Sequence, residues 1–198
     1  MMNNDYVWPG LAAIALAMLT PVFWLYVALS DYTDGIGQGL VAADWVFLLM
    51  GFVTVYVYYA LRRILHDHHN FRDLDIFLAM IIAVNVVFYL GGFALELFAP
   101  LFGDNLAARH ESALGLNMLL TAGCTVAFGI IDILIAFVLM RNSAQLPYPV
   151  KVFAIVTLIQ GIFELTILFS FFTAVIYPVA LIVLAVYFLR KPETIEVI

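Results

Sequence analysis

The sequence has few charged residues, and this shortage indicates the class of protein. Only 11% of its 198 residues are Asp, Glu, Lys or Arg, whereas 66% are hydrophobic. A soluble domain carries about 25% charged and about 45–50% apolar residues. A water-soluble fold of this length would therefore lack a polar surface. The composition predicts an integral membrane protein.

Other absences exclude several function classes. The single cysteine, Cys124, excludes an internal disulfide and a cysteine-based zinc site, and we expect it to be a packing residue. The net charge is −6 and no cluster of basic residues occurs, which argues against nucleic acid as a partner. The sequence contains no P-loop, no GxGxxG, no nucleophile elbow and no HExxH motif. We predict no cofactor, and an enzyme is the least supported class.

Long apolar runs are present instead. A run of about 20 apolar residues crosses a hydrocarbon core of about 30 Å as a helix, and in lipid the helix satisfies its own backbone groups. We predict an all-α polytopic transmembrane bundle, a single domain with six spans at about residues 8–30, 45–65, 76–99, 114–140, 150–173 and 175–189. Because the last two spans follow each other almost directly, five spans with a re-entrant unit remain the alternative.

The longest charged interruption, Leu61–Phe77 (LRRILHDHHNFRDLDIF), determines the predicted orientation, and we call it the charged segment. If it faces the cytoplasm, six spans place seven basic residues inside and one outside. Those inside are Arg62, Arg63, Arg72, Arg141, Lys151, Arg190 and Lys191, and the one outside is Arg109. Short cytoplasmic loops carry such an excess of Lys and Arg. We therefore predict that both termini are cytoplasmic, in a bacterial inner membrane.

The charged segment also holds three of the four histidines, His66, His68 and His69, next to aspartates. Such a group could bind a divalent metal. Adjacent histidines on a loop rarely all reach one ion, however, and spacing alone does not make a cage. We expect a solvated cytoplasmic loop, with the three histidines kept as weak candidates for a metal site.

Polar residues inside the predicted spans fall on shared helical faces. Successive residues of a helix are rotated by about 100°, so the positions of polar residues show which of them share a face. A polar group within a membrane normally faces protein or water. The faces contain Asn85, Tyr89, Gly92 and Glu96 in span three, Asn117, Thr121, Cys124, Thr125 and Asp132 in span four, and Thr157, Gln160, Gly161 and Glu164 in span five. Span two has a weaker stripe of Gly51, Thr54, Tyr58 and Arg62. We expect Glu96 to lie in solvent at the outer interface.

These residues also fall at matching depths. At a rise of about 1.5 Å per residue, Asn85, Asp132 and Gln160 lie about 12–15 Å from the cytoplasmic border, and Tyr89, Thr125 and Glu164 about 20–22 Å from it. Three helices of alternating direction therefore place polar groups at two levels. The two acids differ from the rest because the only bases in the predicted spans, Arg62, Arg63 and Lys151, lie at the cytoplasmic span ends, and none lies deeper to neutralise them. A carboxyl group in lipid without a cation favours its protonated form.

Two function classes follow. In the first, the protein is a transporter or ion-translocating protein, and Asp132 and Glu164 bind protons or cations in a polar cavity that Asn85, Gln160, Thr125 and Tyr89 help to line. In the second, it is a non-catalytic subunit whose polar stripes join helices, copies of the chain or a membrane partner subunit. The lipid bilayer is the partner common to both.

Overall fold

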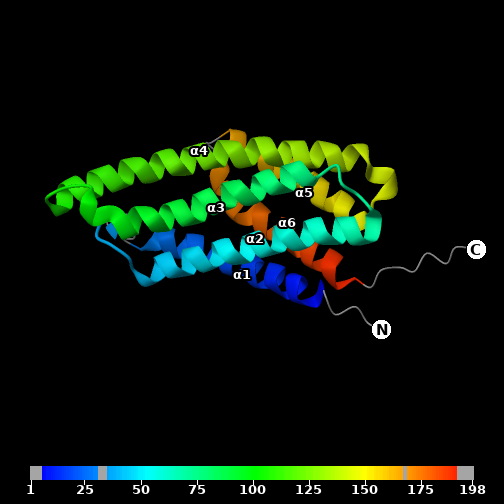
Figure 1. The fold of residues 1–198 in the computed structure, drawn as a ribbon, viewed down its shortest axis with the longest axis horizontal. Helices are drawn as coiled ribbons and strands as arrows, with labels where there is room; N and C mark the ends of the chain where they lie inside the picture. The colour runs from blue at the N-terminus through cyan, green and yellow to red at the C-terminus, as the bar shows by residue number, and fades with distance from the viewer. Residues whose placement is uncertain (1–5, 31–34, 167–168, 191–198) are drawn as a thin grey trace, which may run out of the picture.

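A computed structural model describes residues 6–30, 35–166 and 169–190 of the chain, and these residues contain helices and no strand. The helices are α1 (Val7–Leu29), α2 (Ala42–His69), α3 (Asp75–Phe98), α4 (Leu106–Arg141), α5 (Tyr148–Leu165) and α6 (Thr173–Leu189). Short 3-10 turns, η3 (Ala99–Leu101), η4 (Ser143–Gln145) and η5 (Ser170–Phe172), lie in the connections. Figure 1 shows the elongated bundle that they form. The predicted all-helical bundle is confirmed.

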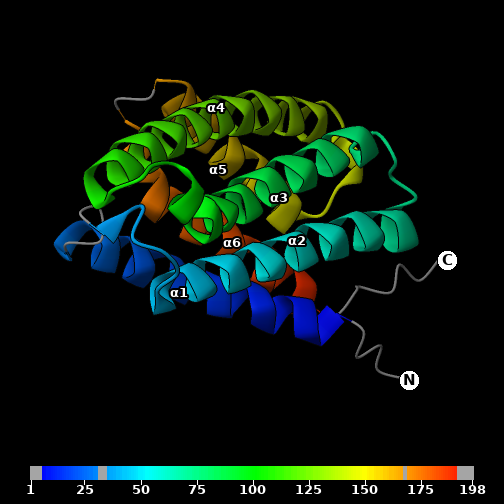
Figure 2. The same cartoon turned by 60° about the vertical axis from the view of Figure 1, so that its left-hand side comes forward.

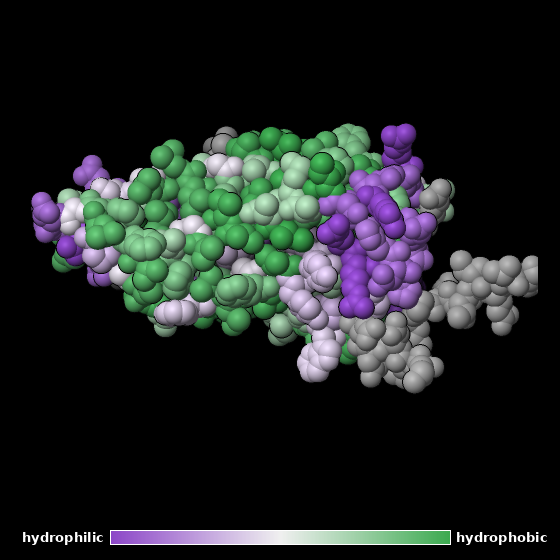
Figure 3. Space-filling model, viewed as in Figure 1, coloured by the Kyte–Doolittle hydropathy of each residue, from purple (hydrophilic) through white to green (hydrophobic). Residues whose placement is uncertain are grey.

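The outward surface of this bundle is apolar. Helices α1 to α5 are long and apolar enough to cross a membrane, and α6 is apolar but shorter. Only 28% to 44% of the most apolar window of each long helix is buried inside the bundle. Large side chains such as Met18, Phe52 and Leu119 are exposed instead. Figure 3 shows the resulting apolar belt between two hydrophilic ends. The chain is an integral, multi-pass membrane protein whose apolar helices face lipid.

The six helices form a closed ring. Each helix packs against the next in sequence, and α6 packs against α1, as the two views in Figures 1 and 2 show. The start of α1 and the end of α6 lie at the same end of the bundle as the α2–α3 connection. We call this the inner end, and the end with the α3–α4 connection the outer end. The start of α1 and the end of α6 lie at one end, as the N-in/C-in prediction requires.

The charged segment is mostly helical, so the prediction of a loop is wrong up to His69. Helix α2 continues to that residue and ends where Asn70 adopts a left-handed conformation with φ 46°. The Arg62 Nε and the His66 Nε2 lie 3.1 and 2.8 Å from the Asp75 carboxylate, which joins α2 to α3. Long basic side chains can reach water from a helix that leaves the membrane. The end of the apolar run therefore does not mark the end of the helix.

Helix α4 starts eight residues before the predicted span, because residues 106–113 are helical rather than part of a loop. The Asn105 side chain accepts a hydrogen bond of 2.9 Å from the Ala108 backbone N–H, and this N-cap begins the helix. Its 36 residues correspond to about 54 Å. This length exceeds a hydrocarbon core of about 30 Å. The first turns of α4 therefore belong to the outer end.

The predicted continuous helix from 150 to 173 is wrong, because α5 ends at Leu165 and η5 precedes α6. The sequence from 166 to 175 contains no Gly or Pro to indicate this break. Helices of 18 and 17 residues are about 27 and 25 Å long. Figure 1 shows η5 well short of the end at which α4 begins. The outer end is therefore built by α1 to α4.

Glu96 is buried, with 7% of its surface exposed, so the prediction of a solvated side chain is wrong. Its carboxylate accepts hydrogen bonds of 3.0 and 3.2 Å from the Gly37 backbone N–H. Gly37 has φ +86°, and a Cβ there would lie 2.9 Å from the Arg109 carbonyl oxygen. The His110 Nδ1 lies 2.8 Å from the Ile36 carbonyl oxygen. Hydrogen bonds between residues far apart in the sequence thus hold the α1–α2 connection against α3 and α4.

The orientation can be tested with reporter fusions. Because six crossings would place seven of the eight basic residues on one side, we expect fusions after Arg72 and Gln145 to report the cytoplasm. Fusions after Gly39 and Asn105 should report the outside. A cytoplasmic signal after Asn105 would contradict this topology.

The outer contact can be tested by replacing Glu96 with Ala. The variant loses a hydrogen bond to a charged group. The free energy needed to open the α1–α2 connection should therefore fall by about 1.5–3 kcal/mol. Hydrogen exchange at the Gly37 amide measures this change as faster exchange. The control is Glu111→Ala, an exposed acid on α4, which should leave the Gly37 amide unchanged. Equal exchange rates in both variants would show that Glu96 does not hold the connection.

Candidate functional site

Asp132 of α4 and Gln160 and Glu164 of α5 meet in the interior of the bundle. Their exposed fractions are 1%, 6% and 6%. The Gln160 Nε2 donates a hydrogen bond of 2.8 Å to the Asp132 Oδ2 and one of 3.1 Å to the Glu164 Oε1. The two acceptor oxygens are therefore no more than about 6 Å apart. One amide group joins two acids from different helices, and we call these three residues the carboxyl site.

Two glycines bring α4 and α5 close enough for this contact. A Cβ on Gly129 would lie 2.9 Å from the Gly161 carbonyl oxygen, and a Cβ on Gly161 would lie 2.8 Å from the Gly129 carbonyl oxygen. The helix backbones therefore touch one turn from Asp132 and next to Gln160. Small residues of this kind let membrane helices approach closely. The local sequence on each helix thus places the amide of one against the acid of the other.

The carboxyl site retains unused bonding capacity. Within the described part of the chain, the Asp132 Oδ1, the Glu164 Oε2 and the Thr157 Oγ1 are buried without a hydrogen-bond partner. Thr157 lies on the same face of α5, one turn inward from Gln160. Buried polar atoms are normally bonded, and an exception calls for an explanation. Each acid thus has one oxygen available to a proton, a water molecule or an ion.

A group of hydroxyl side chains lies beside the carboxyl site. Thr54 and Tyr58 come from α2, Tyr89 from α3 and Tyr177 from α6. The Thr54 Oγ1 and the Tyr177 Oη are 3.3 Å apart, and the Tyr89 hydroxyl also interacts with Thr54. Tyr58 and Tyr177 lie in the same interior region as both acids. Five helices therefore contribute polar side chains to the centre of the ring.

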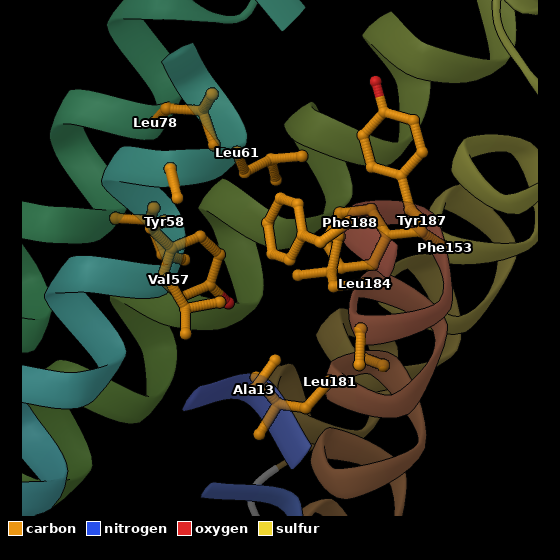
Figure 4. Packing of buried hydrophobic residues seen from close by; sticks show 14 of the residues in the cluster. Ala13, Val57, Tyr58, Leu61, Leu78, Phe153, Leu181, Leu184, Tyr187 and Phe188 are labelled. Atoms are coloured by element: carbon orange, nitrogen blue, oxygen red, sulfur yellow. The ribbon is translucent and has the colours of Figure 1, made fainter. Parts of the chain in front are cut away.

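Apolar side chains close the inner side of this polar centre. Leu61 of α2, Leu78 of α3, Phe153 of α5 and Leu184 and Phe188 of α6 are all buried. Figure 4 shows them gathered between their helices. None of these side chains carries a polar atom. We call them the inner apolar layer, and they separate the carboxyl site from the inner end.

Aromatic side chains lie on the outer side of the same centre. Phe47 stacks on Phe23 with ring centroids 5.7 Å apart and meets Phe88 edge-on at 5.3 Å. Phe88 in turn meets Phe128 at 5.9 Å. Phe128 precedes Asp132 by one turn of α4. These four rings from α1 to α4 form an outer aromatic layer, so the polar centre is enclosed between two apolar layers.

The remaining predicted site residues do not all join this centre. The Asn85 Nδ2 donates to the Ile81 carbonyl oxygen of its own helix at 2.8 Å. Thr125 is half-buried, two turns of α4 from Asp132, and no hydrogen bond among the described residues links it to either acid. Tyr89 belongs to the hydroxyl group through Thr54. The helical period shows which face a residue occupies, but not whether its side chain bonds along its own helix.

Two members of the centre had only a weak signal in the sequence. Thr54 and Tyr58 lie on the faint polar stripe of the second span, where Gly51 makes room for Tyr89: a Cβ on Gly51 would lie 2.5 Å from the Tyr89 Cβ. Tyr177 had no periodic partner in its own helix. Its position beside Pro178 near the middle of the sixth span was the only feature that could have indicated it.

The three histidines of the charged segment do not converge. His66 belongs to the contact with α3 described above. The His68 ring meets the Tyr6 ring edge-on at 5.4 Å, and the His69 ring lies 6.3 Å from the Tyr187 ring. Among the described residues, no three His, Cys, Asp or Glu side chains gather in a way that could hold a metal ion. The histidines instead join α2 to the start of α1, to α3 and to the end of α6.

Comparison of the chain with known protein families, with curated proteins and with solved structures gives no match. The function must therefore be argued from the side chains of the carboxyl site and their surroundings.

The α4–α5 contact can be tested with Gly161→Ala. The added methyl group would meet the Gly129 carbonyl oxygen, so we expect a loss of about 1–3 kcal/mol in stability, as for other overpacked sites. The free energy of unfolding of the purified protein in detergent measures this loss. The matched control is Gly123→Ala on α4, where nothing lies within 4 Å of a new Cβ. There the better helix propensity of alanine should stabilise the protein by up to about 1 kcal/mol. Equal effects of the two variants would contradict the close contact.

Proposed function

We propose that this protein translocates protons or alkali cations across its membrane, with Asp132 and Glu164 as the ion-binding carboxyl groups. The observation that carries the proposal is the shared amide: Gln160 donates one hydrogen bond to each acid. Each acid keeps one buried oxygen without a partner. An ion that binds there would be held by groups from two helices at once.

The lack of any balancing base supports an ion-binding role. The sequence has no Lys, Arg or His before Arg62, between His110 and Arg141, or between Lys151 and Arg190. A carboxylate buried in a membrane is costly, and acids at such positions commonly mark ion pathways. A proton or a bound cation is therefore the natural balance for the negative charge. A purely structural role would be served as well by asparagine and glutamine.

The surroundings support transport through a closed state. The inner apolar layer and the outer aromatic layer enclose the carboxyl site from both ends of the ring. A site that opens to one side at a time must be closed to both sides in between. We assign the described conformation to that closed state, with the charged segment on the cytoplasmic side of a bacterial inner membrane.

A second candidate function is a subunit that binds another membrane chain, a second copy or a partner subunit. It is favoured by the α5–α6 turn, where Phe169, Phe171 and Phe172 are 49%, 65% and 42% exposed. Non-helical backbone within a membrane is tolerated where protein covers it or where it lines a water-filled cavity. A partner chain over these rings would provide such a cover. The carboxyl site would then serve mainly to hold α4 and α5 together.

The neutral substitutions Asp132→Asn and Glu164→Gln separate the two functions. Both keep hydrogen-bonding capacity and remove only the ability to exchange a proton or bind a cation as a carboxylate. If the site translocates ions, each variant should lose pH-driven or cation-driven flux in reconstituted vesicles while it remains folded. The free energy of unfolding in detergent should change by about 1 kcal/mol or less, which is the range of a polar contact between membrane helices.

Glu111→Gln is the matched control, because it neutralises an exposed acid near the start of α4. This variant should carry the same flux as the unmodified protein. Flux that survives both substitutions in the carboxyl site would refute the proposal. Absence of flux for every proton or alkali-cation gradient, together with a stable complex containing a second chain, would favour the subunit instead.

A further inference from the structure

We propose that the outer half of α4 is the surface through which two copies of this chain pair in the membrane, about a two-fold axis along the membrane normal. In this pair, α4 of one copy lies against α4 of the other along Ser112, Gly115, Leu119 and Ala122, which we call the pairing stripe. The proposal does not depend on ion translocation, because the stripe lies on the outside of the ring.

The pairing stripe continues the side of α4 that α5 covers. A Cβ on Gly161 would meet Ile133 and the Gly129 carbonyl oxygen, and a Cβ on Gly129 would lie 3.0 Å from the Leu165 backbone nitrogen. The stripe precedes Gly129 by 7, 10, 14 and 17 positions. At about 100° per residue, it lies within an arc of about 100° that also contains Gly129 and Ile133. Because α5 ends at Leu165, its cover of this side ends beside Gly129.

The exposure of α4 changes at the point where α5 ends. Gly129 is buried, whereas Ala122 and Gly115 are exposed. Nothing lies within 4 Å of a Cβ added to Gly115. The opposite side of the same turns packs on the bundle, where Ala113 and Cys124 are 0% and 7% exposed. One side of the outer half of α4 therefore has a helix-sized space beside it and no helix of its own chain to fill it.

The hydrocarbon of the bilayer does not cover this whole surface. Twenty residues outward from Arg141 correspond to about 30 Å, the thickness of a hydrocarbon core, so the core ends near Thr121. Leu116, Met118 and Leu119 lie beyond that level and are 42%, 62% and 73% exposed. Burial of such apolar area against protein is favourable, because it removes the area from headgroups and water. A large exposed apolar surface of this kind marks a contact with another protein.

The residues of the pairing stripe fit a second copy of the chain. Ser112, Gly115 and Ala122 are small and let two helices approach closely, and the stripe contains no charged residue. A two-fold axis brings the same surface of both copies together, and an axis along the membrane normal keeps the residues at equal levels. Leu119 of each copy then lies between Gly115 and Ala122 of the other, as a knob in a hole. The stripe is therefore complementary to itself.

The α5–α6 turn gives an independent reason for a cover at this place. Figures 1 and 2 both show η5 beside the middle of α4. Leu165 lies beside Gly129, about 18 Å from Arg141 by helical rise, so the turn begins within the hydrocarbon core. Non-helical backbone at this depth requires a cover of protein or a water-filled cavity. A second copy paired through α4 would cover the exposed phenylalanine rings of the turn as well.

A disulfide cross-link tests the pairing in vesicles of phosphatidylcholine. Cys124 is the only cysteine, so Cys124→Ala provides a full-length background without a thiol, into which Gly115→Cys or Ala122→Cys is introduced. A two-fold pair brings each of these positions beside its own copy. With copper phenanthroline as the oxidant, we expect both variants to form a linked dimer about tenfold faster or more than a position that meets only by collision. Leu29→Cys is that control, because Leu29 is 79% exposed at the outer end of α1.

A second measurement removes the pair without disturbing the single chain. Gly115→Leu adds a side chain where nothing of the same chain lies nearby, so the free energy of unfolding in detergent should not fall. In the pair, the same side chain overpacks the contact. We expect the dissociation constant, measured by single-molecule photobleaching over a series of protein-to-lipid ratios, to rise by about tenfold or more. The matched control Ala83→Leu enlarges an exposed residue of α3 and should leave this constant unchanged.

The outcomes separate the pair from the proposed function. Cross-linking as fast at Leu29→Cys as at Gly115→Cys, or a dimer that persists in Gly115→Leu, would overturn the pairing stripe. Single chains at every protein-to-lipid ratio would overturn the pair and leave the surface to lipid or to a different chain. Dimers without flux for any cation would support the pair and refute translocation, whereas flux carried by single chains would do the reverse.

Discussion

The contact between α4 and α5 is the interaction on which the rest of the polar centre depends. Gly129 and Gly161 let the two backbones touch, and this brings Gln160 between Asp132 and Glu164. With a larger residue at either glycine, the helices would separate and Asp132 would lose its hydrogen bond to Gln160. Two acids that share one amide can exist in lipid, because the contact satisfies part of their bonding capacity and leaves a proton or an ion to balance the charge.

The surrounding ring makes this contact a site rather than an isolated pair. Helices α2, α3 and α6 bring hydroxyl groups to it, and the two apolar layers separate it from both ends of the bundle. The ends of the ring are held differently. At the inner end Asp75 binds Arg62 and His66, and at the outer end Glu96 binds the Gly37 backbone. Polar contacts at the ends and a polar centre thus alternate with apolar layers along the bundle.

Much of the candidate site could be predicted from the sequence. Polar residues in lipid are rare, so Asp132, Gln160 and Glu164 stood out, and the helical period with alternating direction placed them near matching depths. Thr54 and Tyr177 could not be found in this way. Hydroxyl side chains are common in membrane helices, and only the packing of α2 against its neighbours across the ring shows that these two meet. Asn85 had the right depth and face, yet it bonds to its own helix.

The sequence by itself determined that the chain is an all-helical membrane protein, because apolar length and scarce charge are sums over residues that need no knowledge of neighbours. It also determined which side of spans two to five is polar. Only the tertiary structure decided that the helices close into a ring, that α5 stops at Leu165 and that Glu96 turns inward to bind a backbone amide. The closed ring and the bond of Glu96 depend on contacts between residues far apart in the sequence, such as Gly37 and Glu96, which are 59 positions apart. Such contacts leave no periodic trace in the sequence, because the period of a helix reports the direction of a side chain and not its partner.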